Sequence, residues 1–382
     1  MSKFQLDFSA RKFTIRTSRE ENSRKTHLEL VLSPQMQKPK IRTMEKLSSE
    51  IGVSRPTLSR FFQDPTSVRT STRARIENAL QTVDYVPNFF ATKMNRKSSG
   101  LIGVIVPHLN DLFFSGLIEA IETSALAADY MVITQNSHND PALEAQAARN
   151  MIAMGADGVI MAPIGDASSI DALSRLKQER PMVFVDSRLQ DHFQDVDFIG
   201  TDNQQSIGLI VDYLCRSGEP PAFLAMPNLN SNNLEREQAY TSRMHELGHE
   251  PMVIPRSTNG ETLGFEEYAY RLMDAYFSHG NLVDQTILCA NDRLAIGVIR
   301  AANRHSLFGT AGKDPSRFRV AGHDDYPLSA FVFPSLTTVT QNTQAIAEAA
   351  TGQLLRHIRR EDRIEDAVSL TFDAELRLRD SA

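Results

Sequence analysis

The sequence predicts an α/β protein made of a small helical N-terminal unit and a larger body with two doubly wound parallel sheets. Between residues 43 and 85, three short helical segments follow one another around a glycine turn. Beyond residue 100, buried β runs alternate with helical segments, which is typical of parallel sheets covered by helices on both faces. About nine β runs favour two such lobes with a cleft between them over a single sheet.

Length and composition set the outer limits of this prediction. A chain of 382 residues exceeds the usual span of one domain. Hydrophobic residues make up 41% of it, and no apolar run approaches the roughly 20 residues of a membrane span. The first residues lack a continuous apolar stretch, so we expect a cytoplasmic protein with no membrane partner. Cys215 and Cys289 have no metal-ligand spacing and are expected to be reduced packing residues, and no cofactor or metal is predicted.

The charge is distributed unevenly along the chain. Residues 1–99 hold 19 Lys and Arg against 9 Asp and Glu, whereas the remaining residues hold 22 against 38. A basic front on an acidic body is expected when only the front meets a polyanion. Chance clustering in a disordered tail is the alternative, but residues 41–99 alone still hold 10 basic against 5 acidic residues.

The first elements in chain order are an extension and a helix. Residues 1–38 are polar, rich in Ser and charge, and without clear period, so we expect a disordered N-terminal extension. Thr43 is placed to cap a helix over "MEKLSSEI", and Gly52 supplies the left-handed residue that ends it.

Two further helices are expected in the same unit. Ser54 is placed to cap a helix over "RPTLSRFF". Pro56 is tolerated there because the N–H groups of a first turn have no intrahelical partner. A third helix is expected over "TRARIENALQTVDY", with Ile76 on its apolar face.

Two short helices joined by a tight glycine turn form the geometry of a helix-turn-helix, which reads DNA. The second helix would present Arg55, Thr57, Ser59 and Arg60 near its N-terminus, where backbone amides and the helix dipole favour phosphate. Arginine can bond guanine O6 and N7 together, and hydroxyls can bond bases or phosphates. A plain three-helix bundle with solvated arginines remains the alternative.

The body follows with its alternating elements. The β runs are expected at residues 101–107, 130–135, 157–163, 181–186, 222–227, 251–255, 286–290, 318–324 and 336–341. The clearest helical segments lie at residues 114–128, 141–154, 204–216, 233–247, 264–278 and 344–359. No Gly-rich phosphate loop, serine nucleophile elbow or HExxH pattern is present, so we expect the body to bind a ligand and not to be an enzyme.

Several motifs taken together carry a family resemblance. "TMEKLSSEIGVSRPTLSRFF", followed by "VRTSTRARIENALQTVDYVPNFFATKM", resembles the headpiece of the LacI/GalR (lac/galactose repressor) family of transcription regulators. The body runs "GVIVPHLNDLFFSGLIEAIE", "PMVFVDSRL", "CANDRLAIGVI", "VAGHDD" and "PSLTTVTQ" match the same family, as does a closing "LRLRDS". The resemblance covers roughly residues 41–382.

The resemblance implies a domain plan and a function. It implies a helix-turn-helix headpiece at 39–86, a hinge helix and linker at 87–99, and a periplasmic-binding-protein-like body for effector binding and dimerisation at 100–382. The N-lobe would hold about 100–198 plus 341–364, and the C-lobe about 199–337 plus 366–382. Such a chain is expected to be a sequence-specific transcriptional regulator, with repression as the expected action. A small-molecule effector, a sugar or sugar phosphate, would control its binding to a palindromic double-stranded operator.

The DNA contacts implied by the resemblance lie in the headpiece and the hinge. Arg55 and Pro56 match the positions that choose the operator, and Met94 matches an apolar wedge, usually Leu, that enters the minor groove and kinks the duplex. The alternative for Met94 is packing within a linker helix. The full set is Thr43, Ser54, Arg55, Pro56, Thr57, Ser59, Arg60, Asn88, Ala91, Lys93, Met94 and Arg96.

The effector contacts implied by the resemblance lie at the interlobe cleft. They are Asp111, Phe113, Phe114, Asp186, Arg236, Asn291, Asp292 and Asp324. Aromatic faces can stack on a sugar, and the planar fork of Arg236 can hold hydroxyls, carboxylate or phosphate. Structural roles stay open for Phe114 as core, for Asp292 as a helix cap, and for Asp186.

Two further implications concern partners and competing functions. The family dimerises through its lobes, and the helix Leu117–Ala127 is a candidate homodimer contact. A periplasmic-type sugar-binding protein would share the two-lobed body but not the headpiece. An α/β enzyme without a DNA role is the second alternative.

Overall fold

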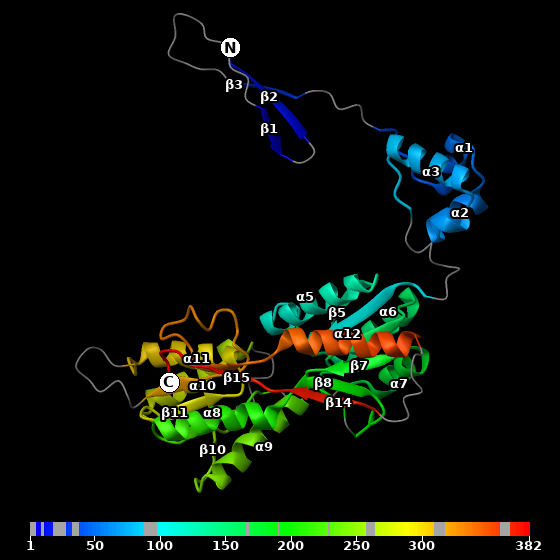
Figure 1. The fold of residues 1–382 in the computed structure, drawn as a ribbon. Coiled ribbons are helices and arrows are strands. Elements are labelled where there is room, and N and C mark those ends of the chain that lie inside the picture. The colour runs from blue at the N-terminus through cyan, green and yellow to red at the C-terminus, as the bar shows by residue number, and fades with distance from the viewer. Residues whose placement is uncertain are drawn as a thin grey trace, which may run out of the picture. The chain divides into compact units, whose positions relative to one another are not determined.

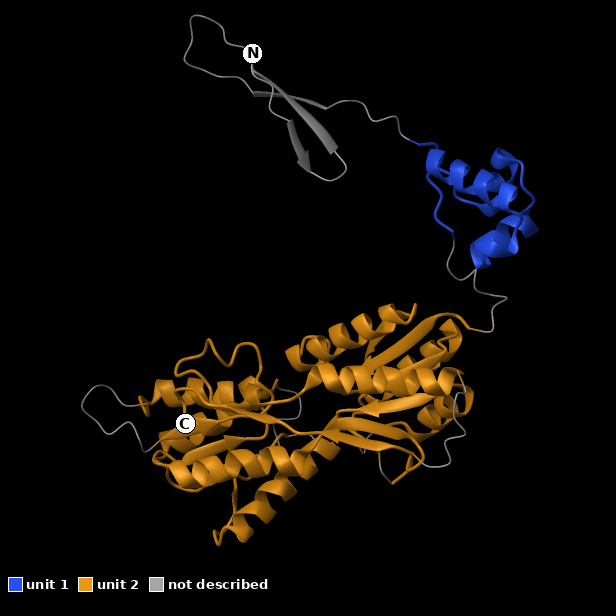
Figure 2. Ribbon diagram, viewed as in Figure 1, with its two compact units in different colours: residues 1–97 blue, residues 98–382 orange. Residues whose placement is uncertain are grey.

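The computed structural model describes residues 5–8, 11–17, 28–32, 38–87, 98–165, 168–189, 191–227, 230–256, 264–308, 318–359 and 367–382 (Figure 1). The chain divides into two compact units, residues 1–97 and residues 98–382 (Figure 2). No helix in the described ranges is long and apolar enough to cross a membrane.

The first 38 residues contain backbone strands, which differs from the expected disorder. β1 (Gln5–Phe8), β2 (Arg11–Thr17) and β3 (Leu28–Leu32) pair antiparallel in the order β1-β2-β3. The missed signal is a period of two: apolar and polar residues alternate through "FTIRT" and in the first part of "LELVL". Overall polarity concealed this alternation.

The headpiece, residues 38–87, contains the three expected helices. They are α1 (Met44–Ile51), α2 (Arg55–Gln63) and α3 (Thr70–Thr82), with a 3₁₀ turn at Pro65–Ser67 before α3. Gly52 has φ 62° and ends α1, so the predicted left-handed glycine is confirmed. The apolar faces meet in one small core formed by Ile41, Leu47, Val53, Leu58, Phe61, Val68, Ile76 and Val83.

The two predicted N-caps differ in detail. Thr43 caps α1 as expected, since its hydroxyl accepts a hydrogen bond from the Lys46 N–H at 3.2 Å. Ser54 occupies the N-cap position of α2, but its hydroxyl bonds the Thr57 hydroxyl at 2.8 Å and no backbone N–H. The prediction that its side chain caps the helix is therefore wrong, because a neighbouring hydroxyl competes for it.

The first lobe of the body is a doubly wound six-stranded parallel sheet in the order β14-β8-β7-β6-β4-β5. Its strands are β4 (Leu101–Val106), β5 (Met131–Asn136), β6 (Gly158–Met161), β7 (Met182–Val185), β8 (Asp197–Thr201) and β14 (Ser369–Phe372). Helices α5 (Leu112–Ala127) and α12 (Thr343–Arg359) cover one face, and α6 (Pro141–Met154) and α7 (Ile170–Glu179) cover the other (Figure 1).

The second lobe has a four-stranded parallel sheet in the order β10-β9-β11-β12. The strands are β9 (Pro221–Leu224), β10 (Met252–Val253), β11 (Thr286–Cys289) and β12 (Arg319–Ala321). Helices α8 (Asn203–Ser217) and α9 (Ser231–Glu246) pack together, as do α10 (Phe265–Ser278) and α11 (Asp292–Arg304). A separate antiparallel pair joins β13 (Thr338–Thr340) to β15 (Glu375–Arg377).

The lobe boundaries differ from those expected. The division at 198/199 falls inside β8, and β14, which was placed in the C-lobe, pairs with β8 in the first lobe's sheet. The stretch "SLTFDAELRL" carries no break that separates β14 from β15. Which sheet a strand joins is decided by tertiary pairing, and strand propensity carries no information about it.

Candidate functional site

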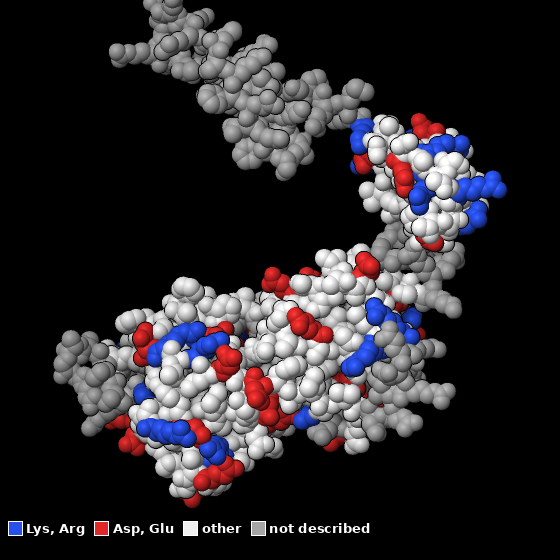
Figure 3. All heavy atoms as spheres, viewed as in Figure 1, with Lys and Arg blue, Asp and Glu red and all other residues white. Residues whose placement is uncertain are grey.

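The outward side of α2 is polar and basic. Leu58 and Phe61 are buried in the headpiece core, whereas Arg55, Pro56 and Arg60 are exposed. Thr57 and Ser59 are partly exposed beside them. Lys and Arg side chains extend from the headpiece surface in Figure 3. An amphipathic helix with this polar side is free to enter a major groove.

The remaining predicted DNA contacts divide into two groups. Thr43 is exposed at the start of α1. The hinge residues lie outside the described residues, and their roles stay predictions; they are Asn88, Ala91, Lys93, Met94 and Arg96.

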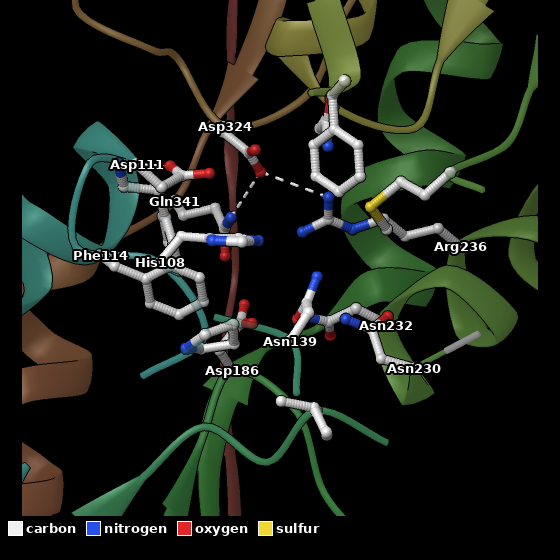
Figure 4. A pocket seen from close by; sticks show the side chains of 16 residues that line it. His108, Asp111, Phe114, Asn139, Asp186, Asn230, Asn232, Arg236, Asp324 and Gln341 are labelled. Carbon is white, nitrogen blue, oxygen red and sulfur yellow. Dashed lines mark hydrogen bonds and ion pairs between the residues drawn. The ribbon is translucent and has the colours of Figure 1, made fainter. Parts of the chain in front are cut away.

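The body contains a cavity between its lobes, close to the carboxyl ends of the parallel strands (Figure 4). The space between its walls is about 620 Å³, including open solvent at the mouth, which suits a small molecule. Both lobes contribute to the lining, which comprises Pro107, His108, Asp111, Phe113, Phe114, Asn139, Ile164, Asp186, Met226, Asn230, Asn232, Arg236, Phe265, Asn291, Asp324 and Gln341.

Seven of the eight predicted effector residues line this cavity, and Asp292 does not. Asp292 is fully buried behind it. Its carboxylate accepts hydrogen bonds from the Ser329 and Thr338 hydroxyls, both at 2.6 Å, and from the Tyr326 N–H at 2.8 Å. Burial raises the pKa of Asp292 to about 7. Asp292 therefore anchors the loop that follows β12, and it is not among the residues that line the cavity.

Asn291, and not Asp292, caps α11. The Asn291 side chain accepts the Leu294 N–H at 2.9 Å while also lining the cavity. Phe114 combines the two alternatives left open for it: it packs in the first lobe's core and still reaches the cavity wall. Its ring lies 5.2 Å from that of Phe113, edge to face.

Arg236 and Asp324 form the polar centre of the cavity. Arg236 lies on α9 and is almost fully buried. Its Nε donates to Asn203 at 3.0 Å, and its Nη1 donates to the Ala290 carbonyl at 2.7 Å and lies 3.3 Å from Asp324 Oδ1. Gln341 also donates to Asp324, at 2.7 Å (Figure 4). Gln341 follows β13 at a crossing between lobes, so this network joins both lobes.

His323 supports Asp324 from within the second lobe. Burial, with the nearby Arg236 charge, lowers the pKa of His323 to about 4, so the imidazole is neutral at neutral pH. Because a carboxylate can only accept, we assign the proton to Nδ1, which lies 2.9 Å from Asp324 Oδ1, and Nε2 accepts from the Ser206 hydroxyl at 2.9 Å. Although burial opposes ionisation, Arg236 and His323 lower the pKa of Asp324.

Asp186 differs from Asp324 because its charge is poorly compensated. Burial raises its pKa to about 7, although Arg236 and a hydrogen bond from Asn232 act in the opposite direction. Asp186 and Asp324 also have positive φ angles, 63° and 122°. Such angles are strained for residues other than glycine, so both carboxylates are held at the cavity at a cost in stability.

Asp111, which lines the cavity, also connects the two lobes. It caps α5 by accepting the Phe113 N–H at 3.0 Å, and its other oxygen accepts from Arg293 Nη1 at 2.9 Å. Arg293 belongs to α11 of the second lobe and also bonds Glu266, at 2.7 and 2.8 Å. A second link runs from the Leu112 N–H to the Tyr326 hydroxyl, at 3.3 Å.

Sequence reasoning missed nine lining residues, namely Pro107, His108, Asn139, Ile164, Met226, Asn230, Asn232, Phe265 and Gln341. Several of them follow the carboxyl end of a strand: His108 follows β4, Asn139 follows β5 and Met226 follows β9. Ligands of open α/β sheets bind outside these strand ends. A search of every position just beyond a predicted strand could have found them.

Comparisons with known proteins agree with this geometry. Residues 43–88 match the family model described as bacterial regulatory proteins, lacI family, and residues 102–362 match the periplasmic binding protein domain. The probable HTH-type transcriptional regulator EndR of Paenibacillus polymyxa is 25% identical over 332 residues, covering 86% of this chain and 94% of EndR.

Solved structures show the same fold. A lac repressor dimer bound to operator and an anti-inducer has a TM-score of 0.73 at 21% identity, covering 89% of this chain and 98% of the repressor. The transcriptional regulator CelR in complex with cellobiose has a TM-score of 0.60 at 19% identity, covering 89% and 99%.

A helix-turn-helix headpiece followed by a two-lobed binding body defines a DNA-binding regulator with a small-molecule site. The chain belongs to the LacI family of bacterial transcriptional regulators. The predicted fold class and the predicted family are both confirmed.

Proposed function

We propose that this protein represses transcription as a homodimer on a palindromic operator, and that a sugar or sugar derivative in the interlobe cavity controls its affinity for that operator. The observation that carries the proposal is the exposed side of α2. Arg55, Pro56 and Arg60 lie on this side and do not pack in the headpiece core. We propose likewise that the protein acts in the cytoplasm and has no catalytic step.

The DNA contacts follow from the chemistry of α2. Arg55 is the first residue of the helix, where it can reach guanine O6 and N7 in the major groove. Pro56 has no donor and offers only an apolar contact, such as a thymine methyl group. Loss of the Arg55 contact should cost about 1–3 kcal/mol of discrimination at one base pair.

Footprinting of DNA around the gene's own locus tests the proposal. We expect a symmetric protected patch. The logarithm of the binding constant should fall linearly with the logarithm of the salt concentration. In gel shifts across every half-site substitution, Arg55→Ala should lose discrimination at a single position, whereas Arg73→Ala on α3 serves as the matched basic control. Absence of any protected patch, with or without sugars, would contradict the proposal.

Control by a ligand is supported by the position of the cavity between the lobes. A ligand can shift a conformational equilibrium only by binding one state more tightly than the other. Asp111 from the first lobe and Arg236 from the second both line the cavity, so a ligand held by both would favour one lobe arrangement. CelR, which shares the fold, is solved with cellobiose.

Homodimer formation is supported by exposed apolar side chains on each lobe. Phe331 and Phe333 are 85% and 82% exposed, and Leu126 on α5 is 74% exposed. Within the candidate segment Leu117–Ala127, Leu117 and Ile121 are buried inside their own lobe. The proposed contact on α5 is therefore its outer side around Leu126.

A further inference from the structure

The lining of the interlobe cavity is acidic. Of its sixteen described residues, three carry carboxyl groups, Asp111, Asp186 and Asp324, and one carries a guanidinium, Arg236. His108 adds no cation, because burial and the Arg293 charge lower its pKa. Lysine is absent from the lining residues just given.

The guanidinium of Arg236 is already engaged by the protein. Two of its nitrogens bond Asn203, the Ala290 carbonyl and Asp324. It is 3% exposed, and within the described part of the chain no partner is seen for its Nη2. A bidentate pair with a phosphate or carboxylate needs a second nitrogen, so it would have to displace Asn203, Ala290 or Asp324 from Nε or Nη1. Its charge largely compensates Asp324.

Arg293, which bonds the lining residue Asp111, is engaged more completely. Its Nε and Nη2 bond Glu266, and its Nη1 bonds Asp111. The guanidinium also lies 5.1 Å from the centre of the Phe265 ring. All three of its nitrogens have partners, so Arg293 offers no vacant fork to an anion.

The groups that remain available suit hydroxyls and ring faces. Asp186 presents a carboxylate that can accept from hydroxyl donors, and Asn139, Asn230 and Asn232 surround the same side of the cavity (Figure 4). Amides donate and accept, which matches the two-way hydrogen bonding of a hydroxyl. Phe113 contributes an apolar ring to the lining, against which a sugar face can lie.

We infer that the cavity selects an uncharged polyhydroxylated ring and rejects the phosphorylated and carboxylated forms of the same compound. This inference narrows the effector of the proposed function and rests on the same cavity. An anionic ligand would lie beside Asp186, with Arg236 already paired with Asp324 and Arg293 already paired with Asp111 and Glu266. Like charges placed together across an interface cost several kcal/mol. A neutral polyol meets no such penalty.

Paired compounds test the inference on the full-length protein by isothermal titration and thermal shift. The pairs are glucose and its phosphate monoester, fructose and its phosphate monoester, and glucose and glucuronate, which keeps the same pyranose ring. In any pair that binds, the neutral member should bind at least about 100-fold more tightly than the anion. An anionic member that binds as tightly as its neutral partner, or more tightly, would overturn the inference.

A charge variant assigns the cause of the discrimination. The titrations are run at about pH 8, where Asp186, whose pKa is raised to about 7, is ionised. Asp186→Asn keeps the shape of the side chain and removes this charge, so the neutral-to-anion ratio should fall at least about tenfold. Asp191→Asn, at an exposed site in the same lobe, should leave the ratio unchanged. An unchanged ratio in Asp186→Asn would overturn the assignment to this carboxylate.

The selectivity of the cavity and the proposed control of DNA binding can fail independently of each other. If neutral sugars bind but leave operator affinity unchanged, ligand control of DNA binding fails and the selectivity stands. If an anionic compound binds more tightly than its neutral partner and releases DNA, the selectivity fails and the proposed control stands.

Discussion

Asp186→Asn should stabilise the body of the protein at alkaline pH. The Asp186 carboxyl group is enclosed by protein at a positive φ of 63°, and burial raises its pKa from an ordinary 3.8 to about 7. The charged groups that face it are Arg236 on α9, Asp324 after β12 and Asp111 at the start of α5, with Asn232 as a hydrogen-bond donor. One cation against two further carboxyl groups leaves the ionised form disfavoured.

The direction of the pH dependence follows from the raised pKa. The folded state holds this proton more tightly than the unfolded state, so the stability that Asp186 contributes is complete below about pH 4 and is lost as the pH rises through about 7. Raising the pKa from 3.8 to about 7 corresponds to about 4 kcal/mol. Because Asp186 lines a cavity that admits water, screening should reduce the cost to about 2 kcal/mol.

The assay is urea unfolding followed by circular dichroism, since the chain contains no Trp. Asp186→Asn should raise the free energy of unfolding by about 2 kcal/mol at about pH 8 and by less than about 1 kcal/mol at about pH 5. His323, whose pKa is lowered to about 4, makes its own contribution to the pH dependence of stability, in the opposite direction. This contribution is present in both proteins, so it cancels when the variant is compared with the wild type at the same pH. Asp191→Asn should stay within about 0.5 kcal/mol at both pH values.

One result would refute this reasoning. If Asp186→Asn lowers stability equally at both pH values, the carboxylate is a net stabilising partner of Arg236 and Asn232, and the inferred cost of its burial is wrong. Either result counts only if the dependence of the unfolding free energy on urea concentration has the same slope in both proteins. A changed slope means that the compactness of the unfolded or the folded state has changed.

Three further predictions concern the lobes, the dimer and the headpiece. A double-mutant cycle of Asp111→Asn and Arg293→Met should give a coupling energy of about 1–3 kcal/mol in urea unfolding. Arg300→Met, on the same helix as Arg293, should show no coupling with Asp111→Asn. Additive effects of Asp111→Asn and Arg293→Met would show that the interlobe ion pair contributes nothing. Phe331→Glu should convert a dimer to monomers in sedimentation velocity, and an unchanged mass would remove this loop from the interface. Leu58→Ala, fully buried in the headpiece, should cost about 2–5 kcal/mol and abolish DNA binding while leaving sugar binding to the body intact in titration calorimetry.

The elements of the body were predictable because their periods are clear. The apolar run before Pro107 and the helix Pro141–Met154 are where the alternation of β runs and helices places them. Local chemistry was equally informative at Gly52, where a left-handed turn requires a residue without a Cβ. Signals of this kind lie within a few residues of one another.

The rest depended on contacts between distant parts of the chain. Asn291 and Asp292 are adjacent and chemically similar, yet one lines the cavity and the other is fixed by Ser329 and Thr338 from other segments. The pairing of β14 with β8 likewise joins residues far apart in sequence. No periodicity along the chain distinguishes these alternatives, because each is decided by which segment the fold brings alongside.

The cost held at the cavity would supply the differential affinity that the proposed ligand control requires. Asp186 and Asp324 keep strained backbone angles, and Asp186 keeps a poorly compensated charge. Hydroxyl donors from a neutral ligand would stabilise the ionised carboxylate in any lobe arrangement that encloses the ligand, and would have no comparable effect in an arrangement that does not. The ligand would therefore favour the enclosing arrangement through the same groups that destabilise the protein without it. Asp186→Asn should accordingly raise stability and weaken the ligand's effect on DNA binding together.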